Sequence, residues 1–203
     1  MMEQILARSE FSLLKREEIS ADGNRRDNLA ELVRLAALDF YSIIPLPAHE
    51  IRCLIGDQLS SPGTETEHLY VARHEGEDVA LFSCLPAAGL DRVRREVALT
   101  IIRRLQGAGK ATFMTSLQRY SATIQPLVAD GLYLSRLAVS PGNRGKGFGA
   151  IAVAALLDLD PSKDIFLHVR RDNTSAVKLY ERFGFKKMDK TDYQFASMVL
   201  SRT

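Results

Sequence analysis

A glycine-rich segment between a predicted strand and a predicted helix constrains this chain most. Residues 144–149 read RGKGFG; a run typical of a β-strand precedes them at 132–140, and a helical pattern begins with them at 147–157. Glycine lets the backbone approach a ligand closely and adopt positive φ. The N–H groups and the dipole at a helix start attract anions, and Arg144 and Lys146 add positive charge. The segment therefore predicts an anion-binding loop, with an ordinary turn between two elements as the alternative.

The segment fits neither of two common nucleotide-binding loops. A P-loop requires a lysine followed by serine or threonine, whereas Gly147 follows Lys146 and Ala111 follows Lys110. A dinucleotide fingerprint opens the first strand–helix–strand unit of a sheet, and this segment comes late in the chain.

Helical and strand patterns alternate along the chain, which predicts an α/β fold with a mixed sheet. Apolar residues three and four positions apart predict helices at 29–40, 51–59, 90–105, 147–157 and 173–183. Runs of β-type residues predict strands at 9–19, 69–73, 79–85, 132–140, 165–170, 185–188 and 194–200. Residues 110–130 fit neither pattern.

Length and composition narrow the class of protein. A chain of 203 residues predicts a single domain, 1–203, and a net charge of +2 gives no electrostatic case for a nucleic-acid partner. No stretch approaches the roughly 18 apolar residues of a membrane span, and the first residues lack the apolar run of a signal peptide. Cys53 and Cys84 fit no zinc spacing, so we expect no metal and two buried, reduced thiols in a cytoplasmic protein without membrane contact.

A second motif lies further along the chain, where residues 173–185 read NTSAVKLYERFGF. With this motif the chain resembles the GNAT superfamily of acyl-CoA-dependent N-acetyltransferases. The first family signature is Arg or Gln, two residues, Gly, one residue, then Gly or Ala; the second is Asn-x-x-Ala-x-x-x-Tyr followed by Gly-Phe. The matching residues are Arg144, Gly147, Gly149, Asn173, Ala176, Tyr180, Gly184 and Phe185. The resemblance is strong over 132–200 and schematic over 1–85.

The resemblance implies a mostly antiparallel, splayed sheet flanked by helices, with acetyl-CoA as cosubstrate and no metal. In the family, the pyrophosphate lies on the glycine loop, which agrees with the anion site above. The pantetheine arm pairs like an extra strand with the strand before that loop. The residues that this resemblance assigns to acetyl-CoA are Leu137, Ala138, Val139, Arg144, Gly145, Lys146, Gly147, Phe148, Gly149, Ala150, Asn173 and Tyr180.

The resemblance also implies catalytic roles. Tyr180 stands where family members keep a tyrosine that protonates the departing thiolate; the alternative is that it only packs its helix on the sheet. His168 stands where the amino-terminal acetyltransferases keep a Glu or His as base; the alternative is a histidine satisfied on a buried strand. Tyr133 is a candidate on the acceptor side, since a regular pleat directs it to the same site.

The resemblance therefore implies an N-acetyltransferase that uses acetyl-CoA. Direct attack of the acceptor amine in a ternary complex is favoured, because no cysteine stands in the motifs as a covalent relay. The acceptor is a peptide or protein amine, or a small-molecule amine. The alternative is a non-catalytic CoA-binding module that uses its arginine-rich helix to bind a partner.

One segment departs from the family pattern. Most members pass from the third strand to the fourth by a short turn, whereas here residues 86–131 intervene before the fourth strand. The helix predicted within them carries Arg92, Arg94, Arg95, Arg103 and Arg104. Four interpretations of this helix are open. It is a solvated basic face, a lid over the acceptor, a docking face for an acidic partner, or the contact surface of a homodimer.

Overall fold

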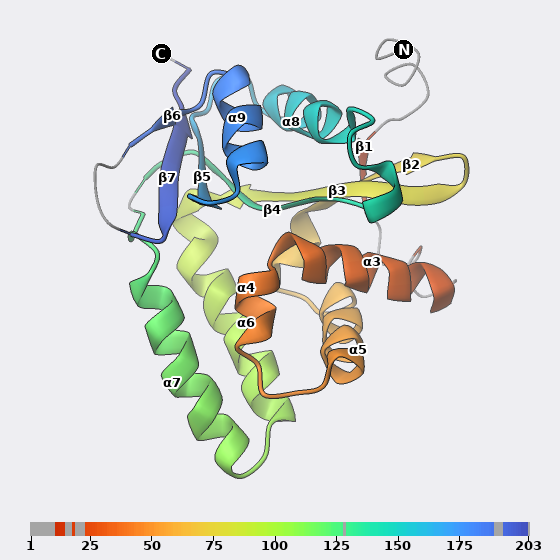
Figure 1. Ribbon diagram of the computed structural model, residues 1–203, viewed down its shortest axis with the longest axis vertical. Helices are drawn as coiled ribbons and strands as arrows, with labels where there is room; N and C mark the ends of the chain where they lie inside the picture. The colour runs from red at the N-terminus through yellow and green to blue at the C-terminus, as the bar shows by residue number, and fades with distance from the viewer. Residues whose placement is uncertain (1–10, 15–17, 19–22, 128, 189–192, 203) are drawn as a thin grey trace.

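A seven-stranded sheet organises the molecule (Figure 1). The computed structural model describes residues 11–14, 18, 23–127, 129–188 and 193–202. The strand order is β1-β2-β3-β4-β5-β7-β6; β4 and β5 are parallel, and all other neighbouring pairs are antiparallel. This confirms the predicted α/β class with a mixed, mostly antiparallel sheet. The strands are β1 (Phe11–Leu13), β2 (Leu69–His74), β3 (Glu77–Pro86), β4 (Leu132–Val139), β5 (Ile165–Arg170), β6 (Lys186–Lys187) and β7 (Phe195–Leu200).

Two helices from the second half of the chain, α8 (Phe148–Asp158) and α9 (Thr174–Arg182), lie on one face of the sheet (Figure 1). The buried side chains of α8 are Phe148, Ile151, Ala152, Val153 and Leu156. Because α8 is apolar nearly all round, it packs between β3, β4 and α9 rather than at the surface. The amphipathic α9 buries Val177 and Tyr180 in the same core.

The opposite face carries three helices from the first half of the chain: α3 (Gly23–Ala36), α4 (Leu38–Ser42) and α5 (Ala48–Leu59). The prediction of one continuous helix over 29–40 is therefore wrong, because the structure divides this stretch into α3 and α4. The chain leaves helical geometry at Ala37, with φ −144° and ψ 48°, and α4 starts in a new direction. The break turns Phe40 and Tyr41 toward the sheet, where each ring centroid lies 6.0 Å from the guanidinium carbon of Arg136.

The sheet is open between β4 and β5. The two strands pair only over residues 132–134 and 165–167; beyond that point β4 stays with β3, and β5 stays with β7. A register shift between Ser83 and Cys84 leaves Ser135 as an extra residue in β4, and such a bulge bends its strand. This confirms the splayed sheet that the resemblance implies.

Two helices, α6 (Leu90–Arg104) and α7 (Ala108–Ala122), connect β3 to β4 along the chain and form the inserted segment, and they lie on the same side of the sheet as α3, α4 and α5 (Figure 1). The apolar spacing predicts α6, which buries one stripe of side chains. Sequence patterns miss α7, which lies mostly within 110–130. Phe113 is the one residue that α7 buries, so this helix has too few apolar positions at helical spacing to give a pattern.

Two further expectations need correction. Cys84 is buried as predicted, but Cys53 is exposed on α5, because it lies off the helix face that packs with Ile51 and Leu54. The strand predicted at 9–19 is observed as the short β1; residues 9, 10, 15–17 and 19 lie outside the described residues. In the described ranges, no helix combines the length and the apolar character needed to cross a bilayer.

Candidate active site

A cavity of about 1020 Å³ opens where β4 and β5 separate. The two strands form its floor, α9 forms one wall, and α4, α6 and α7 form the other. The size suits a small-molecule site. The three residues predicted to act on the acceptor or in catalysis, Tyr133, His168 and Tyr180, all line this cavity, as do Leu137 and Asn173.

The glycine loop lies at the N-terminus of α8, next to the end of β4. Gly145 and Gly147 have φ values of 76° and 96°, a region that other residues adopt only under strain. Arg144 and Lys146 are exposed. The side chain of Phe148 is buried and meets the His74 ring edge-on, so only its backbone can face a ligand. The loop thus has the form of an anion site: an open helix start with two adjacent cations.

Strand β4 connects this loop to the cavity. Leu137 lines the cavity, whereas Val139 ends at the loop and accepts a long hydrogen bond of 3.4 Å from Arg144 Nε. Among the described residues, β4 has no partner on its β5 side after residue 134. Backbone N–H and C=O groups along that edge are therefore available to an extended ligand. Leu137, Ala138 and Val139 lie on this stretch, where the resemblance puts them.

Tyr180 projects from α9 into the cavity, with 7% of its surface exposed. Its ring packs against Phe185 at 5.6 Å between centroids. Burial raises the pKa of the Tyr180 phenol, so the hydroxyl is protonated at neutral pH. Tyr180 packs α9 on the sheet and also lines the cavity, and its role as a general acid stays a prediction.

Asn173 lies at the junction of β5 and α9, where it caps the helix. Its side-chain oxygen accepts a hydrogen bond of 3.2 Å from the backbone N–H of Ala176 and one of 3.0 Å from the hydroxyl of Ser175. The asparagine of the family motif therefore has a structural role here as the N-cap of α9. Asn173 also lines the cavity, so the cap and a ligand contact are compatible.

His168 and Tyr133 form a hydrogen-bonded pair across the floor of the cavity. His168 Nδ1 lies 2.9 Å from Tyr133 Oη. Arg94 of α6 donates from Nη2 to the same hydroxyl at 3.2 Å, and its guanidinium carbon lies 5.5 Å from the Tyr133 ring centroid. Burial raises the pKa of Tyr133, and Arg94 opposes this effect. The sequence predicts His168 and Tyr133 at this site but not Arg94. The only feature of the sequence that could have indicated Arg94 is its position beside the apolar stripe of α6.

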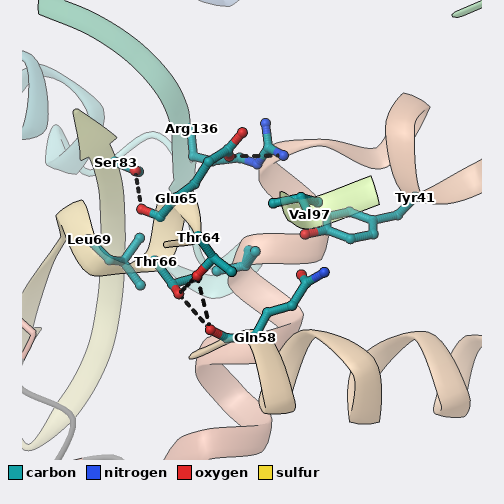
Figure 2. Close-up of a pocket in the computed structure, with 10 residues that line it drawn as sticks. Tyr41, Gln58, Thr64, Glu65, Thr66, Leu69, Ser83, Val97 and Arg136 are labelled. Atoms are coloured by element: carbon teal, nitrogen blue, oxygen red, sulfur yellow. Dashed lines mark hydrogen bonds and ion pairs between the residues drawn. The ribbon is translucent and has the colours of Figure 1, made fainter. Parts of the chain in front are cut away.

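A nearly buried ion pair in the cavity lining is not predicted from the sequence. Arg136 Nη2 lies 3.0 Å from Glu65 Oε2, with both side chains at most 14% exposed. Glu65 belongs to the short helix η1 (Glu65–His68), and Ser83 Oγ donates to its backbone oxygen at 2.7 Å. Figure 2 shows how Thr64 and Thr66 connect this cluster to the carbonyl of Gln58 at the end of α5. The cluster joins α5, η1, β3 and β4.

A third pair joins α4 to the end of β5. Arg170 Nη1 donates to Asp39 Oδ1 at 2.6 Å, and the same guanidinium binds both carboxylate oxygens of Asp172. All three residues line the cavity. Within the described chain, neither cysteine lines the cavity and no group of three or more His, Cys, Asp and Glu side chains is arranged for a metal ion.

Comparison with known proteins identifies the class to which this fold and site belong. The chain matches the family model "Acetyltransferase (GNAT) family" over residues 30–185. The fold is similar to the crystal structure of an N-acetyltransferase from Staphylococcus aureus Mu50, with a TM-score of 0.70 and 16% identity over 94% of this chain and 100% of that one. It is also similar to the PaiA N-acetyltransferase from Thermoplasma acidophilum in complex with coenzyme A, with a TM-score of 0.52 and 15% identity over 94% and 97% of the chains.

A sequence relative matches only a segment. An uncharacterized protein from Mycobacterium leprae is 42% identical over 52 residues, which cover 26% of this chain and 14% of that protein. The chain thus spans a small part of that relative's length. The fold and the family model together define an acyltransferase. Because the model matches most of its length, the chain belongs to the acetyltransferase (GNAT) family.

Proposed function

We propose that the protein is an N-acetyltransferase that transfers an acetyl group from acetyl-CoA to a primary amine in a ternary complex. One observation carries the proposal: a single cavity at the split between β4 and β5 holds Tyr180 and His168, and β4 leads from it to a helix N-terminus suited to phosphate. The bound coenzyme A of the PaiA structure, which shares the fold, supports the choice of cosubstrate.

The residues of the loop and of β4 fit acetyl-CoA. The pyrophosphate lies against the start of α8, where Gly145 and Gly147 bring backbone N–H groups close and Arg144 and Lys146 supply charge. The pantetheine arm pairs with the open edge of β4 at residues 137–139. Acetyl-CoA supplies the acyl group as a thioester, and a backbone N–H on β4 polarises its carbonyl.

Proton transfer is assigned to Tyr180 and His168. When the amine nitrogen bonds to the acyl carbon and the carbon–sulfur bond breaks, Tyr180 donates its phenolic proton to the sulfur. His168 removes the proton from the acceptor nitrogen. In the tautomer with hydrogen on Nδ1, His168 donates to Tyr133 Oη, and Nε2 is the basic nitrogen. Direct transfer is supported by the position of both cysteines away from the cavity lining.

The experiment measures thiol release from acetyl-CoA by the purified protein with a panel of peptides, polyamines and amino acids. We expect release that depends on both an acceptor and the protein. If acetyl-CoA binds tightly, as judged by calorimetry, but no acceptor causes release, the protein is instead a non-catalytic CoA-binding module. In that case the arginines of α6 become the candidate surface for its partner.

A further inference from the structure

The inserted helix α6 places two arginines and one carboxylate, a local charge of +1, on the wall of the cavity beside His168 and Tyr133. Eight charged side chains line this cavity: Asp39, Glu65, Asp91, Arg94, Arg95, Arg136, Arg170 and Asp172. Three of the four carboxylates are paired within the wall, since Glu65 binds Arg136, and Asp39 and Asp172 both bind Arg170. Together the paired groups carry a net charge of −1, so the α6 charges are set apart by being unpaired and not by the total charge of the lining.

The charges on α6 are arranged differently. Among the residues that the structure describes, no ion pair within 4.0 Å engages Asp91, Arg94 or Arg95. Arg94 is half-buried and Arg95 is exposed. Both line the cavity, together with Asp91 of the same helix. An arginine held in a partly desolvated wall without a carboxylate partner is suited to bind an anion from outside.

The position of Arg94 relative to His168 limits where that anion lies. A single hydroxyl, Tyr133 Oη, separates the Arg94 guanidinium from the imidazole, with hydrogen bonds of 3.2 Å and 2.9 Å. The contact with the Tyr133 ring fixes the direction of the guanidinium, and its other N–H groups remain available as donors. An anion on Arg94 therefore lies a few ångströms from the base that acts on the amine.

We infer that the acceptor is a small molecule that carries a carboxylate close to its amine, and that Arg94, assisted by Arg95, binds this carboxylate. The inference rests on the proposed function. A guanidinium beside the amine also disfavours the ammonium form, and attack requires the neutral amine. Phe40, Leu117 and Tyr120 line the same cavity and provide apolar surface for the rest of the acceptor. The same cations disfavour polyamines, which carry further positive charge.

The test compares three acceptors with one side chain: phenylalanine, phenylalaninamide and phenethylamine. They share the amine and the ring, and only the first has a carboxylate. For the wild-type protein we expect kcat/KM to be at least about 10-fold higher for phenylalanine, the range of a hydrogen-bonded charge pair. In Arg94→Met this preference disappears, and in Arg94→Lys, which keeps the charge without the fork geometry, part of it remains. Arg92→Met is the matched control, because Arg92 is exposed on the same helix and lies outside the cavity lining.

The outcomes separate this inference from the proposed function. Equal turnover of the three acceptors, or a preference that survives in Arg94→Met, overturns the carboxylate site. If Arg94→Met lowers kcat/KM equally for all three, Arg94 only positions Tyr133 and His168, and the inference is again wrong. Acetylation of peptides or polyamines alone overturns the inference and leaves the proposed function standing, whereas no acetylation of any amine overturns the proposed function itself. If circular dichroism shows that Arg94→Met does not fold, Arg95→Met replaces it, because Arg95 is exposed. Since Arg95 only assists Arg94, we then expect the preference for phenylalanine to fall but not to disappear, and an unchanged preference overturns the inference.

Discussion

At the scale of single residues, Tyr180 and the pair of His168 and Tyr133 are the cavity groups to which we assign proton transfer and acceptor binding. Tyr180 is nearly buried and lines the cavity, and burial raises the pKa of its phenol. A phenol with a raised pKa keeps its proton at neutral pH and can donate it to a departing thiolate. The sequence motif predicts this residue; the hydrogen-bonded partner of His168 follows only from the structure.

Tyr180→Phe removes the hydroxyl and keeps the ring that packs with Phe185. We expect kcat to fall about 100-fold, because the general acid is lost, while the affinity for acetyl-CoA stays within about twofold. Stopped-flow thiol detection and calorimetry measure the two quantities. Unchanged turnover would show that Tyr180 only packs α9 on the sheet.

The two cysteines should differ sharply in reactivity. Cys53 is exposed, whereas Cys84 is buried in β3, where desolvation raises the pKa of its thiol to about 12. In the native protein iodoacetamide should therefore alkylate Cys53 alone, and Cys84 should react only after unfolding. Peptide mass mapping after a short exposure to iodoacetamide at neutral pH measures the labelling of each cysteine. Fast labelling of Cys84 in the native protein would contradict its burial.

At the scale of elements, the start of α8 is where the glycines are required. Gly147 has a φ of 96°, so an alanine there carries backbone strain of about 1–2 kcal/mol. We expect Gly147→Ala to lower the free energy of unfolding by that amount and to weaken acetyl-CoA binding. Gly142→Ala is the matched control, because Gly142 lies in the same connection at ordinary φ with open space around its Cα. Urea unfolding and calorimetry compare the two variants, and equal effects would remove the special role of the loop.

The helices show where sequence patterns end. Strand β5 is predicted at its observed bounds, and α8 and α9 to within a residue or two. The apolar periodicity of α9 is strong, and α8 is an apolar run that starts at the glycine loop. The helix α7 gives no pattern because most of its surface is exposed. The break between α3 and α4 is also missed, since apolar spacing continues through Ala37 although the backbone turns.

At the scale of the whole molecule, polar pairs between distant segments connect the layers, and sequence reasoning finds none of them. Glu65 with Arg136 and Asp39 with Arg170 join residues far apart in the chain. Such pairs depend on the packing of complete elements, so neither charge pattern nor local propensity reveals them. The cavity wall formed by α6 has the same origin: the chain predicts an arginine-rich helix, and only the fold turns Arg94 toward Tyr133.

The Glu65–Arg136 pair offers a test of this connection. Glu65→Gln leaves the nearly buried Arg136 charge without its counter-ion, so we expect the free energy of unfolding to fall by about 3 kcal/mol. The combined change Glu65→Leu with Arg136→Met should recover most of the loss, because it removes both charges. Glu31→Gln, which breaks the more exposed pair with Arg34, serves as control and should cost less than about 1 kcal/mol. Urea unfolding measures all three, and equal losses for Glu65→Gln and Glu31→Gln would contradict the assignment.

The central claim is that the cavity between β4 and β5 acetylates an amine. The most direct measurement is mass spectrometry of a library of primary amines incubated with acetyl-CoA and either the wild-type protein or Tyr180→Phe. We expect the wild-type protein to add the mass of one acetyl group to at least one amine, only with acetyl-CoA present, and Tyr180→Phe to make far less of the same product. A library in which no amine gains an acetyl group, with acetyl-CoA bound to the folded protein, would contradict it.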